Sequence, residues 1–137
     1  MKDKILIDSN VWIYLASKQD ERKKKIAGEL IDSHFNSIIL SVQILGEIFT
    51  VLDKKTDLTK NEIAKITSYY VDTFEVISSG KEIFNKAVRI RLKYGYGFFD
   101  SLIISTGIVA DCTILYSEDL QHNQLIEKKL RIINPFK

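Results

Sequence analysis

The stretch KILIDSNVWIY, residues 4–14, sets the beginning of the fold. Residues 4–7 have the apolar, β-branched character of a buried strand, and residues 11–14 are apolar again. Between them stands Asp8, a carboxylate in sequence that favours burial. Because an unpaired buried carboxylate is costly, Asp8 needs hydrogen-bond donors, a cation or a metal ion as its partner. The stretch therefore predicts a buried strand followed directly by a polar group.

Short apolar runs alternate with longer helical periods along the rest of the chain. We expect strands at residues 4–7, 38–42, 75–77, 112–116 and 131–133. We expect helices at residues 20–35, around the apolar stripe of residues 44–52, and at residues 59–74, 80–94 and 98–110. Strands that alternate with helices predict an α/β fold with a mainly parallel sheet, in a single domain over residues 1–137.

The composition is that of a globular protein without structural cross-links. The chain has 137 residues, of which 45% are hydrophobic, and one cysteine, Cys112, so no internal disulfide is expected. No signal peptide is visible, and the apolar stretch at residues 102–110 falls short of the roughly 20 residues that span a bilayer. We expect a cytoplasmic protein without a membrane segment.

Four acidic residues fall at comparable places in the expected fold. Asp8 follows the first strand directly, and Asp119 comes three residues after the strand at 112–116. Glu47 belongs to the helix after the second strand, and Asp100 to the first turn of the helix at 98–110. In an open parallel sheet, ligands bind beyond the carboxyl ends of the strands. The four carboxylates are therefore expected to meet if the first and fourth strands are neighbours.

Each acid also has a purely structural interpretation. Asp8 and Asp100 can serve as helix caps, Glu47 can be a solvated helix residue, and Asp119 can be a loop acid. Taken together, clustered carboxylates without a neighbouring Lys or Arg repel one another and need a cation. Mg²⁺ and Mn²⁺ prefer oxygen ligands, and such a site suits the hydrolysis of nucleic acid phosphodiesters. With four of the 18 acidic residues in one site, 20 basic residues face 14 acidic ones, a balance of +6 that would attract RNA.

The chain resembles a PIN domain, and more narrowly a VapC-type toxin ribonuclease, over essentially its whole length. The resemblance depends on ILIDSNVWIY, SVQILGEIFTVL, YGFFDSLIISTGIVADCTILYSEDL and LRIINPFK, in that order. It implies a three-layer α/β/α sandwich with a mainly parallel central sheet. It also implies that Asp8, Glu47, Asp100 and Asp119 are metal ligands and catalytic residues, while Asn10 and Ser117 support the site.

The resemblance further implies an activity and its partners. The expected protein is a Mg²⁺- or Mn²⁺-dependent endoribonuclease that cleaves RNA, forms a homodimer and is inhibited by a cognate antitoxin. One departure is visible at Asn123, where close relatives often have glycine. Asparagine tolerates a left-handed conformation, so the turn is expected to survive.

Several residues outside the acid cluster have interpretations of their own. Arg89 and Arg91 precede Asp100 and are a hypothetical RNA-binding pair, with nearby tyrosines as stacking faces. His122 is interpreted as a surface loop residue and His34 as a helix C-terminal residue rather than as metal ligands. Trp12, Phe98 and Phe99 are interpreted as core or dimer-interface packing, and Cys112 as a buried core residue.

Two other functions remain open. A Mg²⁺-dependent phosphomonoesterase would use Asp8 as a nucleophile, but such enzymes need a general acid where this chain has Asn10. A non-catalytic PIN-like module for RNA or protein binding would normally lack some of the acids, whereas this chain has all four. A phosphatase assay and a Mn²⁺ titration separate these alternatives.

Overall fold

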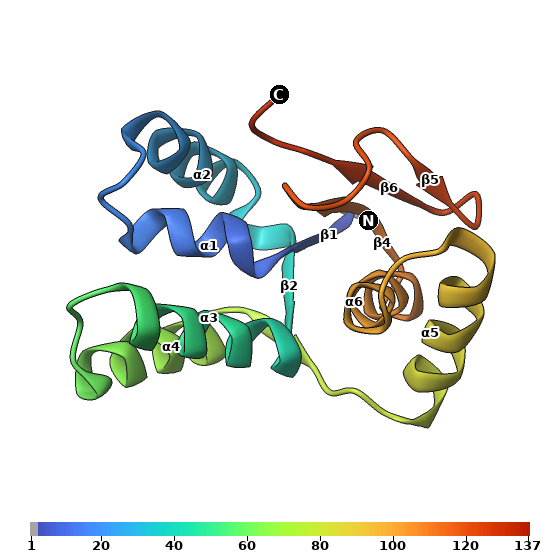
Figure 1. Cartoon of the computed structure of the whole chain (residues 1–137), viewed down its shortest axis with the longest axis horizontal. Helices are drawn as coiled ribbons and strands as arrows, with labels where there is room; N and C mark the ends of the chain where they lie inside the picture. Colours follow the sequence, from blue (N-terminus) through green and yellow to red (C-terminus); the bar gives the residue numbers. More distant parts are fainter. Residues whose placement is uncertain (1–2) are drawn as a thin grey trace.

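Six strands and six α-helices alternate along residues 3–137, the part of the chain that the computed structural model describes (Figure 1). The strands are β1 (Lys4–Ile7), β2 (Ile38–Ser41), β3 (Glu75–Ile77), β4 (Cys112–Tyr116), β5 (Leu125–Ile126) and β6 (Leu130–Ile133). The helices are α1 (Ser9–Ala16), α2 (Glu21–Ser33), α3 (Val42–Lys55), α4 (Lys60–Thr73), α5 (Lys81–Tyr94) and α6 (Phe98–Val109), with a 3₁₀ turn at Phe35–Ser37. Within this range, no helix is long and apolar enough to cross a bilayer.

The expected elements are confirmed with small shifts at their ends. The second strand was expected to reach Val42, but Ser41 ends β2 because its side chain caps α3, and Val42 is the first helical residue. The short strand β5 was not expected. It has two residues and pairs antiparallel with β6, so it is too short to leave a pattern in the sequence.

The sheet has the strand order β3-β2-β1-β4-β6-β5, in which only β5 is antiparallel. The chain moves one way from β1 to β2 and β3, and then returns past β1 to β4. Because parallel crossovers are right-handed, the two directions place their helices on opposite faces of the sheet. Figure 1 shows α1–α4 on one side of the strands and α5 and α6 on the other. The expected three-layer α/β/α arrangement is confirmed.

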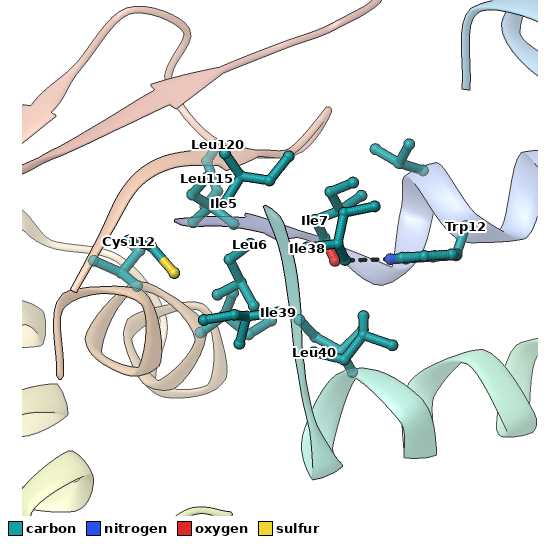
Figure 2. Packing of buried hydrophobic residues seen from close by; sticks show 14 of the residues in the cluster. Ile5, Leu6, Ile7, Trp12, Ile38, Ile39, Leu40, Cys112, Leu115 and Leu120 are labelled. Carbon is teal, nitrogen blue, oxygen red and sulfur yellow. Dashed lines mark hydrogen bonds between the residues drawn. The ribbon is translucent and has the colours of Figure 1, made fainter. Parts of the chain in front are cut away.

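The core is centred on the three neighbouring strands β2, β1 and β4. Leu6, Leu40 and Leu115 are completely buried there, and Figure 2 shows how these side chains interleave. Trp12 on α1 is also buried, and its indole Nε1–H donates to the carbonyl of Ile7, 3.0 Å away (Figure 2). This bond fixes the first turn of α1 against the end of β1. Trp12 is thus a core residue, as expected.

Several helices begin at the carboxyl edge of the sheet. α1 starts one residue after β1, and α3 starts directly after β2. α6 leads back into β4 through a short turn, so its first residues also lie near this edge. A hydrogen bond of 3.3 Å from Gln43 Nε2 on α3 to the carbonyl of Phe99 on α6 joins the two helix beginnings. Residues from four separate segments therefore meet beyond β1 and β4.

The topology of an open α/β sheet predicts a crevice for a ligand between β1 and β4, where the chain connections diverge. The chain leaves β1 toward β2 on one side, whereas β4 leads to β6 on the other. The register pairs Ile7 with Tyr116, so the next residues, Asp8 and Ser117, come side by side. Divergent connections of this kind create binding sites in open α/β sheets.

Candidate functional site

Asp8 is the most buried acid at this edge, with 4% of its surface exposed. It caps α1, where its Oδ1 accepts from the backbone N–H of Ser9 at 2.7 Å, and its Oδ2 accepts from Ser117 Oγ at 2.8 Å. Burial, together with smaller contributions from the negative charges of Glu47 and Asp119, raises the pKa of Asp8 from 3.8 to about 6 despite these two hydrogen bonds. Asp8 is thus a desolvated carboxylate among other carboxylates.

Asn10 and Ser117 hold the loop that leaves β4. Asn10 Nδ2 donates to Asp119 Oδ2 at 2.9 Å, and Asn10 Oδ1 accepts from the backbone N–H of Glu118 at 3.3 Å. Ser117 Oγ donates to Asp8 and accepts from the backbone N–H of Asp119 at 3.3 Å. Both supporting residues are therefore placed between the first and fourth strands, where they orient two acids without neutralising their charge.

Glu47 is partly buried in the second turn of α3. Its Oε2 accepts from Ser9 Oγ at 3.3 Å, and its Oε1 accepts from Gln43 Nε2 at 3.1 Å. Burial raises the pKa of Glu47, and the negative charges of Asp100 and Asp119 act in the same direction. Glu47 therefore faces the same crevice from the α1–α4 side of the sheet.

Asp100 reaches this edge from the opposite face, in the first turn of α6. Burial raises the pKa of Asp100, and the charge of Asp119 raises it further. The electrostatic influence of Asp119 on Asp8, Glu47 and Asp100 shows that the four predicted acids share one neighbourhood. In the described part of the chain, the four Lys–acid ion pairs all use other acids. Within residues 3–137, the cluster thus has no Lys or Arg as an ion-pair partner.

The cluster is open rather than closed into a cage. Among residues 3–137, no three Asp, Glu, His or Cys side chains form an arrangement that could hold a metal ion by themselves. Mg²⁺ commonly keeps several waters and needs only one or two direct carboxylates. A set of four carboxylates that forms no ion pair within the described residues fits such a hydrated, hard divalent ion. The donor chemistry therefore suits Mg²⁺ or Mn²⁺ held partly through water.

Other predicted residues lie away from these contacts. Arg89 and Arg91 are exposed on α5, and Arg91 donates to the carbonyl of Gly95 at 3.2 Å, so their role in RNA binding stays a prediction. His122 accepts from the backbone N–H of Asn134 at 2.9 Å and links the loop to the C-terminal segment, while His34 caps α2 as expected. Asn123 adopts the left-handed conformation, with φ of 69°.

Two residues of the site were not identified from the sequence. Ser9 donates toward Glu47 across 38 residues of sequence, and Gln43 bridges Glu47 and the start of α6. The signal for Gln43 was its position four residues before Glu47, where side chains on a helix meet. Ser9 had no such signal, because its partner depends on how α1 and α3 pack.

Comparisons with known proteins identify the family of the chain and agree with its fold. The family model described as PIN domain matches residues 5–128. No curated protein matches the chain. Among solved structures, VapC20 of Mycobacterium tuberculosis, described as a sarcin-ricin loop cleaving toxin, is 19% identical with a TM-score of 0.70, covering 85% of this chain and 90% of that one. A toxin–antitoxin complex from Klebsiella pneumoniae is 18% identical with a TM-score of 0.74, covering 96% and 98%. DNA-bound VapBC from Salmonella typhimurium is 16% identical with a TM-score of 0.71, covering 96% and 97%.

Proposed function

Because the chain belongs to the PIN domain family, we propose that it is a divalent-metal-dependent endoribonuclease. The observation that supports this proposal most strongly is the charge at the carboxyl edge of β1 and β4. Four acids lie within electrostatic reach of one another, three of them have raised pKa values, and none of the ion pairs within residues 3–137 includes them. A fold with no use for a cation would gain stability by losing these charges.

The proposed site assigns a role to each group of residues. Asp8, Glu47, Asp100 and Asp119 would hold Mg²⁺ or Mn²⁺, which when bound activates water and offsets charge on the phosphodiester. Ser117 and the backbone of Ser9 fix the two oxygens of Asp8 in different directions. In the overall reaction, water adds to phosphorus, the bond from phosphorus to one ribose oxygen breaks, and that oxygen gains a proton.

We further propose that the protein is the toxin of a toxin–antitoxin pair. The support is structural likeness to a sarcin-ricin loop cleaving toxin and to toxin–antitoxin complexes over most of both chains. The substrate would be RNA, the regulator would be a cognate antitoxin, and the working form would be a cytoplasmic homodimer. Asp53→Asn is a useful control for the experiments below, because it removes an exposed carboxylate from the same helix as Glu47.

A Mn²⁺ titration followed by thermal unfolding tests the metal site. Binding to the native state alone stabilises it by about 2.7 kcal/mol when the ion is present at about 100 times its dissociation constant. The unmodified protein and Asp53→Asn should show this gain, whereas Asp8→Asn should lose most of it. An unmodified protein that shows no Mn²⁺-dependent change would contradict the proposal.

Controlled expression tests the activity. The unmodified protein should arrest growth and release RNA fragments, whereas Asp8→Asn and Asp100→Asn at equal abundance should not. Sequencing the fragment ends would identify the RNA. Turnover of a small phosphomonoester without RNA cleavage would instead favour the phosphatase alternative, and Mn²⁺ binding without either activity would favour the non-catalytic module.

A further inference from the structure

A second polar cluster connects the loop that follows β4 to helices α1 and α2. We call it the Glu118 clamp, formed by Tyr14 on α1, Lys23 on α2 and Glu118 between Ser117 and Asp119. The Tyr14 hydroxyl donates to Glu118 Oε1 at 2.8 Å, and Lys23 Nζ donates to Glu118 Oε2 at 2.5 Å. Lys23 Nζ also donates to the Tyr14 hydroxyl at 3.2 Å. The three side chains therefore bond pairwise into one unit.

The charged side chains of the clamp are largely shielded from solvent. The side chains of Lys23 and Glu118 are 26% and 23% exposed. Lys23 Nζ lies 5.1 Å from the ring centre of Tyr14 and 5.3 Å from that of Phe136, and the two rings pack edge to face at 5.1 Å. Ion pairs held in one geometry by aromatic packing contribute more than mobile surface pairs do. The clamp is thus a defined structural contact.

The clamp acts on a loop whose other side carries the candidate site. Ser117 donates to Asp8, and Asp119 accepts from Asn10, so the residues before and after Glu118 both face the crevice. The backbone N–H of Glu118 donates to Asn10 on that same side, while its carboxylate reaches α1 and α2. One residue therefore connects the loop to the helices and to the acid cluster.

We propose that Glu118, Lys23 and Tyr14 are positioning residues that set the placement of Ser117 and Asp119 for metal binding. This inference rests on the proposed metal-dependent function. Groups that orient metal ligands from outside commonly change metal affinity by about 10–100-fold when they are removed. The loop leaves β4 only one residue before Glu118, so a displaced Glu118 shifts its two neighbours directly.

The substitution Lys23→Met distinguishes a role of Lys23 in positioning the loop from the effect of its positive charge on metal binding. Lys23 is a positive charge near a proposed cation site, so its removal by charge alone would tighten Mn²⁺ binding. If Lys23 acts by holding the loop, its removal weakens binding. Tyr14→Phe provides a second, charge-neutral variant that deletes one hydroxyl and is expected to fold even if Lys23→Met does not.

The chain offers a matched control in a second cluster of the same composition. Lys93 Nζ and the Tyr94 hydroxyl donate to Glu127 Oε2 at 2.8 Å and 2.9 Å, and Lys93 lies 5.4 Å from the Tyr94 ring centre. Glu127 belongs to the turn between β5 and β6, and the hydrogen bonds of this cluster within residues 3–137 do not include the four acids. Lys93→Met and Tyr94→Phe therefore make the same chemical changes away from the loop.

The test measures Mn²⁺ affinity by calorimetric titration of the folded proteins. We expect the dissociation constant to rise about tenfold in Lys23→Met and several-fold in Tyr14→Phe. It should stay within about twofold in Lys93→Met and Tyr94→Phe, since supporting residues act locally. Unchanged or tighter binding in Lys23→Met, or equal losses in the control variants, would overturn the proposal.

Amide hydrogen exchange in the absence of metal tests whether the clamp orders the loop, independently of metal binding. The amides of Glu118 and Asp119 should exchange faster in Lys23→Met and Tyr14→Phe than in the unmodified protein, because local opening of the loop becomes easier. If the unmodified protein binds no Mn²⁺, the proposed function fails while exchange still decides whether the clamp orders the loop. If it binds Mn²⁺ but the clamp variants keep full affinity and slow exchange, the clamp proposal alone fails.

Discussion

The buried charge of Asp8 is expected to lower the stability of the metal-free protein at neutral pH. The substitution Asp8→Asn tests this expectation. The substitution keeps nearly the same shape and removes the charge from a side chain with 4% exposure. In the absence of metal, the ionised carboxylate is stabilised by two hydrogen-bond donors and opposed by desolvation and by the charges of Glu47 and Asp119. The variant is therefore expected to be more stable than the unmodified protein at neutral pH.

The size of the effect follows from the raised pKa of Asp8. A rise from 3.8 in the unfolded chain to about 6 in the folded one corresponds to about 3 kcal/mol, at ~1.36 kcal/mol per pH unit. Asparagine can still accept from Ser9, but its amide replaces the oxygen that accepts from Ser117, at a loss of about 1 kcal/mol. The net gain at pH 7 is therefore about 2 kcal/mol.

The difference in stability between Asp8→Asn and the unmodified protein is expected to increase as the pH rises. Below about pH 3.8, Asp8 is protonated in the folded and the unfolded chain, so it carries no penalty. As the pH rises to about 6, the folded state binds more protons than the unfolded one, and the unmodified protein loses stability relative to the variant. Above pH 6 the difference stays constant. At pH 4 the variant should be equal or slightly less stable.

Urea unfolding at pH 4 and pH 7 with a chelator present measures this difference. Asp53→Asn serves as the control, since it removes an exposed carboxylate of α3 that is not one of the four clustered acids. The reasoning is refuted if Asp8→Asn is less stable than the unmodified protein at pH 7, or if their difference does not change between the two pH values.

Three further changes test the site and its support. Asp100→Asn should reduce the rise in melting temperature with Mn²⁺, because one of the proposed oxygen ligands is lost; an undiminished rise would exclude Asp100 as a ligand. Trp12→Phe removes the donor to the Ile7 carbonyl and should lower the free energy of unfolding in urea by about 1–3 kcal/mol; a loss under about 0.5 kcal/mol would contradict the role of this bond. Leu130→Ala truncates a completely buried side chain of β6 and should cost about 2–5 kcal/mol in the same assay, whereas a near-neutral result would mean that the core around β6 is loosely packed.

The sequence predicted most of the fold because its elements are locally encoded. Four of the five parallel strands, at residues 4–7, 38–41, 75–77 and 112–116, are short apolar runs next to helices, and the helix periods between them are regular. Thr59 and Glu62, three residues apart, form a capping box at the start of α4, a signal that is local in the sequence. β5 was missed because its pairing follows from the left-handed turns around it, which involve Asn123, Glu127 and Lys128 rather than an apolar pattern.

The order of the strands was the step that the sequence left open. Asp8 and Asp119 were expected to meet only if the first and fourth strands were neighbours, and the sheet places β4 directly beside β1. The other hydrogen bonds around the four acids depend on packing between segments that are far apart in the sequence. Ser9 reaches Glu47 because α1 packs against α3, and Gln43 reaches α6 because two helices from opposite faces begin at the same edge. No local pattern encodes such contacts.

Asp8 shows why a structural and a functional interpretation of one residue need not compete. It caps α1, as its position before Ser9 suggested, and it also stands at the centre of the acidic crevice. A cap alone does not explain the choice of aspartate, because serine, threonine or asparagine caps a helix about equally well. Those residues would carry no charge into a site where burial raises the pKa to about 6. The cap determines where the carboxylate lies, whereas a bound cation is the partner that would make its negative charge favourable.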